Sequence, residues 1–255
     1  MLNAIIFDVD GTLADTENVH RVCFNRAFVT SGLSWHWDKS QYGELLKVTG
    51  GKERIAHYIG TLGPAALTAA QRDELVATLH RVKTRFYERI IQQGAMRLRP
   101  GVAALIAAAR ADGIRLAVAT TTSPPNVVAL LKATLGPDAL AMFDVIAAGD
   151  SVARKKPAPD IYVSALEQLS LPASDCVAIE DSHNGLRAAV AADLVTIVTP
   201  STYTAGEDFS GAARVVDSLE NLSTCGDVPE IGAGILKAIR GIHFRSRVSI
   251  LHGAS

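Results

Sequence analysis

The sequence predicts an α/β fold: a doubly wound parallel sheet with a helical cap inserted after its first strand. The apolar run at 4–7 is followed at once by Asp8 and Asp10, the pattern of a buried strand that ends at a turn. Residues 16–93 have helical spacing almost throughout. From about residue 100 onward, strand-like and helix-like segments alternate, which is typical of a parallel sheet built from βαβ units.

The segment after the first turn predicts the cap. An early helix carries Phe24 and Phe28 one turn apart, and glycine-containing turns separate the helices at 50–51 and 60–64. We expect the cap to cover residues 15–95. Its longest helix has apolar residues at i, i+4, i+7, i+11 and i+15, namely Leu75, Leu79, Val82, Phe86 and Ile90.

The remaining segments predict a core domain over residues 1–14 and 96–225, with hinges to the cap near 13–16 and 94–100. A helix opens at Pro100-Gly101, and continuous apolar runs alternate with helices after it. Such runs indicate strands that helices cover on both faces of the sheet. Besides the first strand, we expect strands at 114–120, 144–148, 176–180, 194–198 and 214–216.

The tail over residues 226–255 has a weaker hydrophobic pattern than the segments before it. Ile231, Ile235 and Ile239 have the spacing of a short helix, but the last fifteen residues match neither a strand nor a helix well. We therefore expect a loosely held surface segment at this end of the chain.

Composition argues against several classes of protein. A formal net charge of −1 argues against a nucleic-acid binder driven by bulk charge. Cys23, Cys176 and Cys225 lack CxxC spacing, so we expect reduced buried thiols rather than disulfides or a zinc site. The start of the chain lacks the basic region of a signal peptide, and no apolar run reaches the roughly 18 residues of a membrane span. We expect a cytoplasmic protein, by default a monomer, without nucleic-acid or membrane partners.

Polar residues recur where the predicted strands end. Because these ends lie side by side in a doubly wound sheet, acids, hydroxyls and a lysine are expected to gather at one edge. Carboxylate oxygens suit Mg²⁺, hydroxyls and lysine suit phosphate oxygens, and a carboxylate beside them can act as a nucleophile. This set suffices for phosphoryl transfer. Its members are Asp8, Asp10, the run Thr120-Thr121-Thr122-Ser123, Asp150, Lys155, Lys156, Glu180 and Asp181.

Two other phosphate or metal motifs fail on their spacing. An EF-hand loop starting at Asp8 would need glycine and glutamate where Leu13 and Val19 stand. A P-loop around Gly50-Gly51-Lys52 would need Ser or Thr in place of Glu53, and an upstream glycine in place of Leu46. Neither a calcium loop nor a nucleotide loop is therefore predicted.

Four motifs in order resemble those of the haloacid dehalogenase superfamily: Asp8-Val9-Asp10-Gly11-Thr12, the strand end at Thr120, Lys156-Pro157, and Glu180-Asp181-Ser182. The resemblance covers about residues 1–222, and the helical insertion resembles the cap of that superfamily. Within it, the chain is similar to the phosphoglucomutase-like branch and most of all to the CbbY-type phosphatases, which remove xylulose-1,5-bisphosphate, an inhibitor of Rubisco in the Calvin cycle. The closer match is carried by Ala14-Asp15-Thr16-Glu17 with His20, and by residues 49–55, 118–123 and 145–150.

The resemblance implies a role for each motif residue. Asp8 is the expected nucleophile, and Asp10 the expected general acid and base. Thr120 and Lys156 are expected to hold the transferring phosphoryl group. Mg²⁺ would be bound by Asp8, by the backbone carbonyl of Asp10 and by Asp181, with Glu180 either a ligand or a close neighbour of the ion.

The cap and the hydroxyl run supply the expected substrate-binding residues: Glu17, His20, Tyr42, Gly51, Lys52, His80, Lys83, Thr121 and Thr122. A bisphosphate needs a second cationic site, for which Lys52, His80 and Lys83 are the candidates, with Arg54 and Arg85 in reserve. A solvated basic helix face is the alternative for each of these cations. Trp35 and Trp37 are expected to contribute to packing.

The expected activity is Mg²⁺-dependent hydrolysis of a small sugar phosphate, most specifically of xylulose-1,5-bisphosphate to xylulose 5-phosphate. Cap closure would exclude water during the first transfer. Two alternatives stay open: a β-phosphoglucomutase-type mutase or a phosphatase of another small phosphoester such as phosphoglycolate, and a non-catalytic sugar-phosphate sensor. The presence of both Asp8 and Asp10 argues against the sensor.

Overall fold

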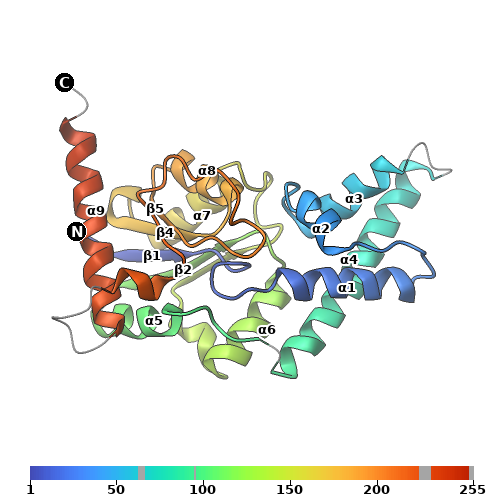
Figure 1. Ribbon diagram of the computed structural model, residues 1–255, viewed down its shortest axis with the longest axis horizontal. Coiled ribbons are helices and arrows are strands. Elements are labelled where there is room, and N and C mark those ends of the chain that lie inside the picture. The colour runs from blue at the N-terminus through green and yellow to red at the C-terminus, as the bar shows by residue number, and fades with distance from the viewer. Residues whose placement is uncertain (63–66, 95, 224–230, 253–255) are drawn as a thin grey trace.

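The computed structural model describes residues 1–62, 67–94, 96–223 and 231–252. Its described strands form one parallel sheet in the order β3-β2-β1-β4-β5-β6, which lies in the left half of Figure 1. The α/β fold class and all six expected strands are confirmed. The strands are β1 (Ala4–Phe7), β2 (Arg115–Thr120), β3 (Val145–Ala148), β4 (Cys176–Glu180), β5 (Val195–Val198) and β6 (Arg214–Val215).

Four helices between β1 and the rest of the core form the cap, at the right of Figure 1: α1 (Glu17–Thr30), α2 (Lys39–Leu45), α3 (Gly51–Thr61) and α4 (Ala69–Gln92). An aromatic cluster holds three of them together. Phe24 and Phe28 of α1 contact Trp37, with ring centroids 4.9 and 4.8 Å apart, and Trp37 contacts Tyr58 of α3 at 5.3 Å. The tryptophans therefore pack, as expected. The turn expected at 60–64 begins later, because α3 continues to Thr61; residues 63 and 64 lie outside the described residues.

The buried face of α4 is offset by one residue from the expected one. Leu79 lies on it as predicted, whereas Leu75, Val82, Phe86 and Ile90 are only partly buried. Lys83 and Tyr87 turn inward because polar and aromatic partners from α1 meet them there, including His20 and Phe24. The buried positions of α4 are Val76, Leu79, Lys83, Tyr87 and Ile91.

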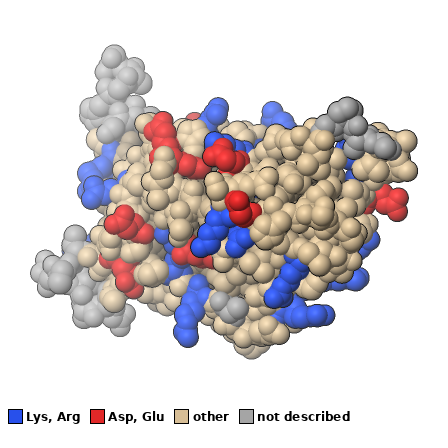
Figure 2. Space-filling model, turned by 45° about the vertical axis from the view of Figure 1, so that its right-hand side comes forward, with Lys and Arg blue, Asp and Glu red and all other residues tan. Residues whose placement is uncertain are grey.

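Charged side chains of both signs share the face of the molecule drawn in Figure 2. Lysine and arginine groups neighbour aspartate and glutamate groups near its middle. No helix in the described part of the chain is both long enough and apolar enough to cross a membrane.

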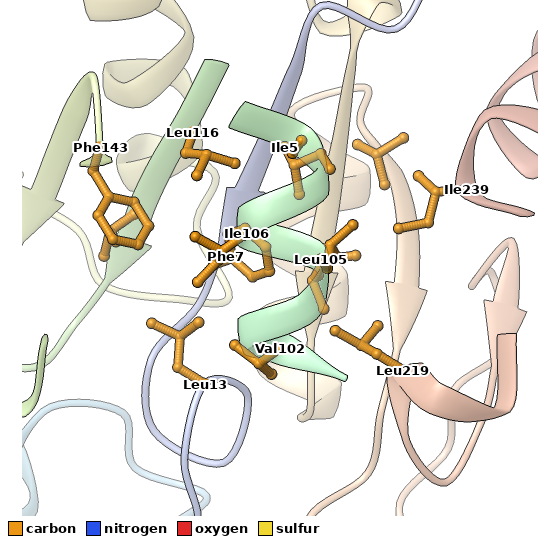
Figure 3. Packing of buried hydrophobic residues seen from close by; sticks show 14 of the residues in the cluster. Ile5, Phe7, Leu13, Val102, Leu105, Ile106, Leu116, Phe143, Leu219 and Ile239 are labelled. Carbon is orange, nitrogen blue, oxygen red and sulfur yellow. The ribbon is translucent and has the colours of Figure 1, made fainter. Parts of the chain in front are cut away.

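Helices cover both faces of the sheet, and alternation along β1 shows how. Ile5 and Phe7 point to one face, where Leu105 and Ile106 of α5 pack on them (Figure 3), whereas Ala4 and Ile6 point to the other. The first face is covered by α5 (Val102–Ala111), α6 (Pro124–Leu135) and α9 (Ile231–His252), and the second by α7 (Asp160–Leu169) and α8 (His183–Ala191). Short 3₁₀ turns lie at Ala139–Met142 (η1), Ala173–Asp175 (η2) and Leu219–Leu222 (η3).

The helix expected from Ile231, Ile235 and Ile239 is confirmed, but the expectation of a loosely held tail is wrong for the described residues, because the helix continues to His252. These residues form α9 (Ile231–His252), which packs beside α5; Figure 3 shows Ile239 in the core. His243 Nε2 donates a hydrogen bond to Ser174 O at 2.8 Å, and Arg240 pairs with Asp112 at 2.6 Å. The helix stays packed against the core because its apolar side chains are buried there, namely those of Ile235, Leu236, Ile239 and Ile242. Cys23 and Cys176 are buried free thiols as expected, while Cys225, residues 226–230 and residues 253–255 lie outside the described part of the chain.

Candidate active site

The carboxyl ends of three adjacent strands bring the core motifs together. Asp8 follows β1, Thr120 ends β2 and Glu180 ends β4, and the β1 pairings with β2 and β4 set these ends side by side. Asp8 N–H donates to Ile179 O at 3.0 Å, which continues the ladder one residue past β1. One cavity between core and cap is lined by Asp8, Asp10, Thr120, Lys156 and Asp181 from the core motifs.

Lys156 joins two of the acids. Its Nζ donates to Asp8 Oδ1 and to Glu180 Oε1, each at 2.6 Å, and to Ala119 O at 2.9 Å. The side chain is buried, so each of these charge-assisted bonds lies out of water. Its neighbour Lys155 instead donates to Asp150 at 2.6 Å, so Lys156 is the inner lysine of the pair.

Three carboxylates lie close enough to share a cation. Asp8, Glu180 and Asp181 each offer an oxygen within 4.8 Å of the others. Burial raises the pKa of Asp8 to about 8 against the opposing pull of Lys156, and burial together with the charges of Asp8 and Glu180 raises the pKa of Asp181 well above its usual range. An all-oxygen set whose members repel one another fits Mg²⁺, a hard cation that prefers such ligands.

Gly11 makes the approach of Asp181 possible. Its φ of +84° lies in the left-handed region, and a Cβ there would lie 2.1 Å from Asp181 Oδ2. Glycine alone satisfies both requirements. Thr204 Oγ1 donates to the same oxygen at 3.3 Å from the loop after β5.

Glu180 is surrounded by donors. Its Oε1 accepts from Lys156 Nζ and from Tyr162 OH, each at 2.6 Å, and its Oε2 accepts from Asp181 N–H at 3.1 Å. A Cβ on Gly185 would lie 2.0 Å from this carboxylate, so α8 passes directly against it. These contacts fix Glu180 as the anchor of Lys156, whether or not it also binds the ion.

Asp10 has a different environment from Asp8. Its Oδ1 accepts a hydrogen bond from Thr16 Oγ1 and one from His20 Nε2 at 2.9 Å. His20 Nδ1 lies 2.6 Å from Lys83 Nζ, and the imidazole stacks on Tyr87 at 4.3 Å. Burial acts to raise the pKa of Asp10, but the charge and hydrogen bond of His20, the bond from Thr16 and the charge of Lys83 outweigh it and lower the pKa. Two carboxylates on one turn thus have pKa values that are shifted in opposite directions, that of Asp8 upward and that of Asp10 downward.

The hydroxyl run after β2 lines the cavity opposite the acids. Thr120 Oγ1 accepts from Thr122 N–H at 3.2 Å, which closes a tight turn before α6. Among the described residues, the buried Ser123 Oγ has no hydrogen-bond partner. Thr121, Thr122 and Ser123 also face the cavity, so this turn presents polar groups to a ligand.

Most of the expected substrate-binding residues line the cavity, and two do not. The residues that line it are Glu17, His20, Gly51, His80, Lys83, Thr121 and Thr122. Tyr42 is fully buried behind Glu17, to which its OH donates at 2.7 Å. Lys52 is partly exposed, and its Nζ lies 2.6 Å from Asp150 Oδ2.

The two reserve candidates for the second cationic site, Arg54 and Arg85, also lie in different places. Arg54 is buried and lines the cavity, where Nε donates to Leu45 O at 3.1 Å and Nη1 donates to Tyr42 OH at 3.0 Å. Arg85 is exposed on α4 and is not among the lining residues. Burial, followed by the charges of Lys83 and Lys52, lowers the pKa of His80 to about 3, so its imidazole is neutral near pH 7 and is not a cationic site.

Several residues that line the cavity were not predicted from the sequence. Asn184 Nδ2 donates to Lys47 O at 3.2 Å and to Thr49 Oγ1 at 3.1 Å, and so bridges core and cap. The rule that polar residues cluster at strand ends also applies to β5, and would have pointed to the loop that carries Thr204. Two further lining residues carry no local signal: Leu46 and Glu207.

The family profile of the haloacid dehalogenase-like hydrolases matches residues 2–193, which include every core motif just described. The chain belongs to this family. As a member it is an enzyme, and its relatives identify it as a phosphatase. Helix α9 lies beyond the matched residues.

Four comparisons relate this haloacid dehalogenase-like hydrolase to known proteins. Protein CbbY of Cereibacter sphaeroides is 53% identical over 224 residues, covering 87% of this chain and 94% of the relative. The crystal structure of CbbY from Rhodobacter sphaeroides in complex with phosphate has a TM-score of 0.80, with 86% of this chain and 95% of that chain covered. A mutant of the same protein, in complex with xylulose-(1,5)bisphosphate, matches equally well. β-Phosphoglucomutase of Clostridium difficile, at 19% identity and a TM-score of 0.74, shares the fold.

Proposed function

We propose that the protein is a Mg²⁺-dependent phosphatase that hydrolyses xylulose-1,5-bisphosphate to xylulose 5-phosphate and phosphate through an aspartyl-phosphate intermediate. One observation carries the proposal: Asp8 and Asp10 share a turn, but Asp8 is held by Lys156 and Asp10 by His20. The similarity to a CbbY protein bound to xylulose-(1,5)bisphosphate supports the choice of substrate.

In the first step, a carboxylate oxygen of Asp8 attacks phosphorus while the bond from phosphorus to the sugar oxygen breaks. Asp10 gives its proton to that oxygen as it leaves. Lys156, which already donates to Asp8 and Glu180, offsets negative charge on the phosphoryl oxygens. The hydroxyls of Thr120 and Ser123 stabilise the same oxygens by hydrogen bonding.

In the second step, Asp10 takes a proton from water as the water oxygen attacks phosphorus, and the bond from phosphorus to Asp8 breaks. Thr16 and His20 stabilise the deprotonated form of Asp10 by donating to its Oδ1. This arrangement therefore favours Asp10 as the base. Thr16 directly precedes α1 and His20 lies on it, so the position of this cap helix and the protonation state of Asp10 are linked.

The residues fit a bound Mg²⁺. Asp8 and Asp181 would hold it with their carboxylates and Asp10 with its backbone carbonyl, while Glu180 lies within reach of the same point. When bound, Mg²⁺ supplies positive charge that offsets the repulsion between these acids and the substrate phosphate.

We further propose that residues 15–95 act as the cap and carry the second phosphate site. Arg54 is now the leading candidate for it, because it is a buried guanidinium that faces the cavity from α3. Lys83 is held by His20, and Lys52 pairs with Asp150 and does not line the cavity. Glu17, which accepts from Tyr42, is placed to receive a sugar hydroxyl.

Phosphate release from a panel of phosphoesters tests the proposal: xylulose-1,5-bisphosphate, ribulose-1,5-bisphosphate, phosphoglycolate and β-glucose 1-phosphate, each with Mg²⁺. We expect the xylulose ester to react fastest, and Asp8→Asn to stop its turnover without changing the circular dichroism spectrum. Equal rates for the two bisphosphates would contradict the substrate. Conversion of β-glucose 1-phosphate into its 6-phosphate with little free phosphate would indicate a mutase. Turnover by Asp8→Asn near the parent rate would exclude Asp8 as the nucleophile.

A further inference from the structure

A nearly buried arginine lies where the two segments between core and cap run side by side. Arg99 N–H donates to Leu13 O at 2.8 Å, so the two segments are hydrogen-bonded to each other. The Arg99 side chain is only 9% exposed. Its guanidinium donates to four backbone carbonyls: Gly11 O, Thr199 O at 2.6 Å, Pro200 O at 2.8 Å and Asp217 O at 3.2 Å.

Two of these carbonyls belong to loops that support the acidic cluster. Gly11 follows Asp10 directly, and its Cα lies against the Asp181 carboxylate. Thr199 N–H donates to Glu180 O at 2.8 Å, and the loop that starts there carries Thr204, which donates to Asp181. Arg99 therefore ties together the two chain segments that enclose Asp181.

The chemistry of the guanidinium explains why arginine stands here. It has five N–H donors in a rigid plane, so one side chain satisfies carbonyls on both sides of it. Buried carbonyls without a donor are costly, and the lysine ammonium cannot reach the same spread of acceptors in one plane. Asp15 Oδ1, 3.6 Å from Nε, adds a carboxylate contact.

We propose that Arg99 is a positioning residue whose guanidinium fixes the separation between the Asp8–Asp10 turn and Asp181. It touches none of the reacting groups and acts through the carbonyls of Gly11 and Thr199. Because Leu13 and Arg99 are both anchored to the core, cap movement is confined to the residues between them. The turnover part of this inference rests on the proposed function, whereas the metal-binding part rests on the geometry alone.

Variants at Arg99 test the proposal against a matched control. Arg97 lies two residues away on the same segment and is exposed, so Arg97→Met makes the same chemical change outside the network. Three variants are compared with the parent: Arg99→Met, Arg99→Lys and Arg97→Met. Mg²⁺ affinity is measured by titration calorimetry without substrate, and kcat and KM with p-nitrophenyl phosphate and with xylulose-1,5-bisphosphate.

We expect Arg99→Met to weaken Mg²⁺ binding and to lower kcat for both substrates by about 100-fold, as for a misplacement of about 1 Å, with little change in KM. Arg99→Lys should lie between Arg99→Met and the parent, and Arg97→Met should match the parent. Arg99→Lys carries the test alone if Arg99→Met does not fold.

A purely structural arginine would give a different result. The melting temperature would fall while Mg²⁺ affinity and kcat stayed at the parent values, and that outcome would overturn the proposal. A parent that binds Mg²⁺ but hydrolyses no substrate would contradict the proposed function, while calorimetry would still decide the role of Arg99. A parent that does not bind Mg²⁺ would overturn both.

Discussion

Replacing Gly11 by alanine should move a metal-binding acid without touching its chemistry. A Cβ at Gly11 would lie 2.1 Å from Asp181 Oδ2, where carbon atoms essentially never approach within 3.0 Å. Asp181 must therefore retreat by about 1 Å, and a displacement of that size costs about 100-fold in rate. A 100-fold loss corresponds to about 2.7 kcal/mol of lost transition-state stabilisation.

The same substitution also strains the backbone, and a second glycine isolates that effect. Gly32 has a φ of +74°, close to the +84° of Gly11, but a Cβ there would meet nothing within 4 Å. Left-handed backbone costs a non-glycine residue about 1–2 kcal/mol, so both variants should lose a comparable amount of stability.

The assay compares Gly11→Ala with Gly32→Ala in phosphate release at saturating Mg²⁺, alongside thermal unfolding of each. We expect Gly32→Ala to keep the parent kcat and Gly11→Ala to lose about 100-fold. A folded Gly11→Ala protein with kcat within about threefold of the parent, less than about 1 kcal/mol, would refute the idea that Gly11 sets the place of Asp181.

Three further outcomes are expected. Ile239→Ala in α9 should destabilise the protein by about 2–4 kcal/mol because the side chain is fully buried, whereas Phe244→Ala, at 69% exposure, should change the free energy of unfolding little. Equal losses of stability for the two variants in denaturant titrations would contradict the packing of α9. Burial raises the pKa of Cys23 to about 11 and that of Cys176 to about 12, so both thiols should resist iodoacetamide at pH 8 until the protein unfolds. Peptide mapping that finds either cysteine alkylated in the folded protein would contradict these raised pKa values. Burial lowers the pKa of Lys83 to about 8 from 10.5, so the folded state binds fewer protons than the unfolded state between these values. The stability of the parent relative to Lys83→Met should therefore rise from pH 8 to 10.5, and a flat difference would contradict the lowered pKa of Lys83.

The strands were predictable because their signals are local. The five strands β1 to β5 carry mostly apolar runs, as parallel strands buried on both faces require, whereas β6 is an exposed two-residue strand at the edge of the sheet. The acids and hydroxyls after these runs could also be placed together, since parallel strands share one carboxyl edge. Asp8, Thr120 and Glu180 therefore met in the structure as the chain direction required.

The cap was harder to predict because helix faces depend on partners. Periodicity placed Leu79 inward but assigned the inner face one position too early, since Lys83 is buried by pairing with His20 rather than by being apolar. The same limit affected the tail. The isoleucines of α9 had helical spacing, but only the surface of α5 shows why they are buried.

Sequence alone therefore determined the fold class, the strand ends and the residues able to carry phosphoryl transfer, because each depends on neighbours along the chain. Tertiary structure decided the rest. It gave Asp8 and Asp10 different partners, Lys156 and His20, placed Tyr42 behind Glu17 and paired Lys52 with Asp150 away from the residues that line the cavity. It also brought Arg99 to carbonyls that lie 88 to 118 residues away in sequence. Contacts over such separations leave no periodic signal, because backbone carbonyls are the same at every residue.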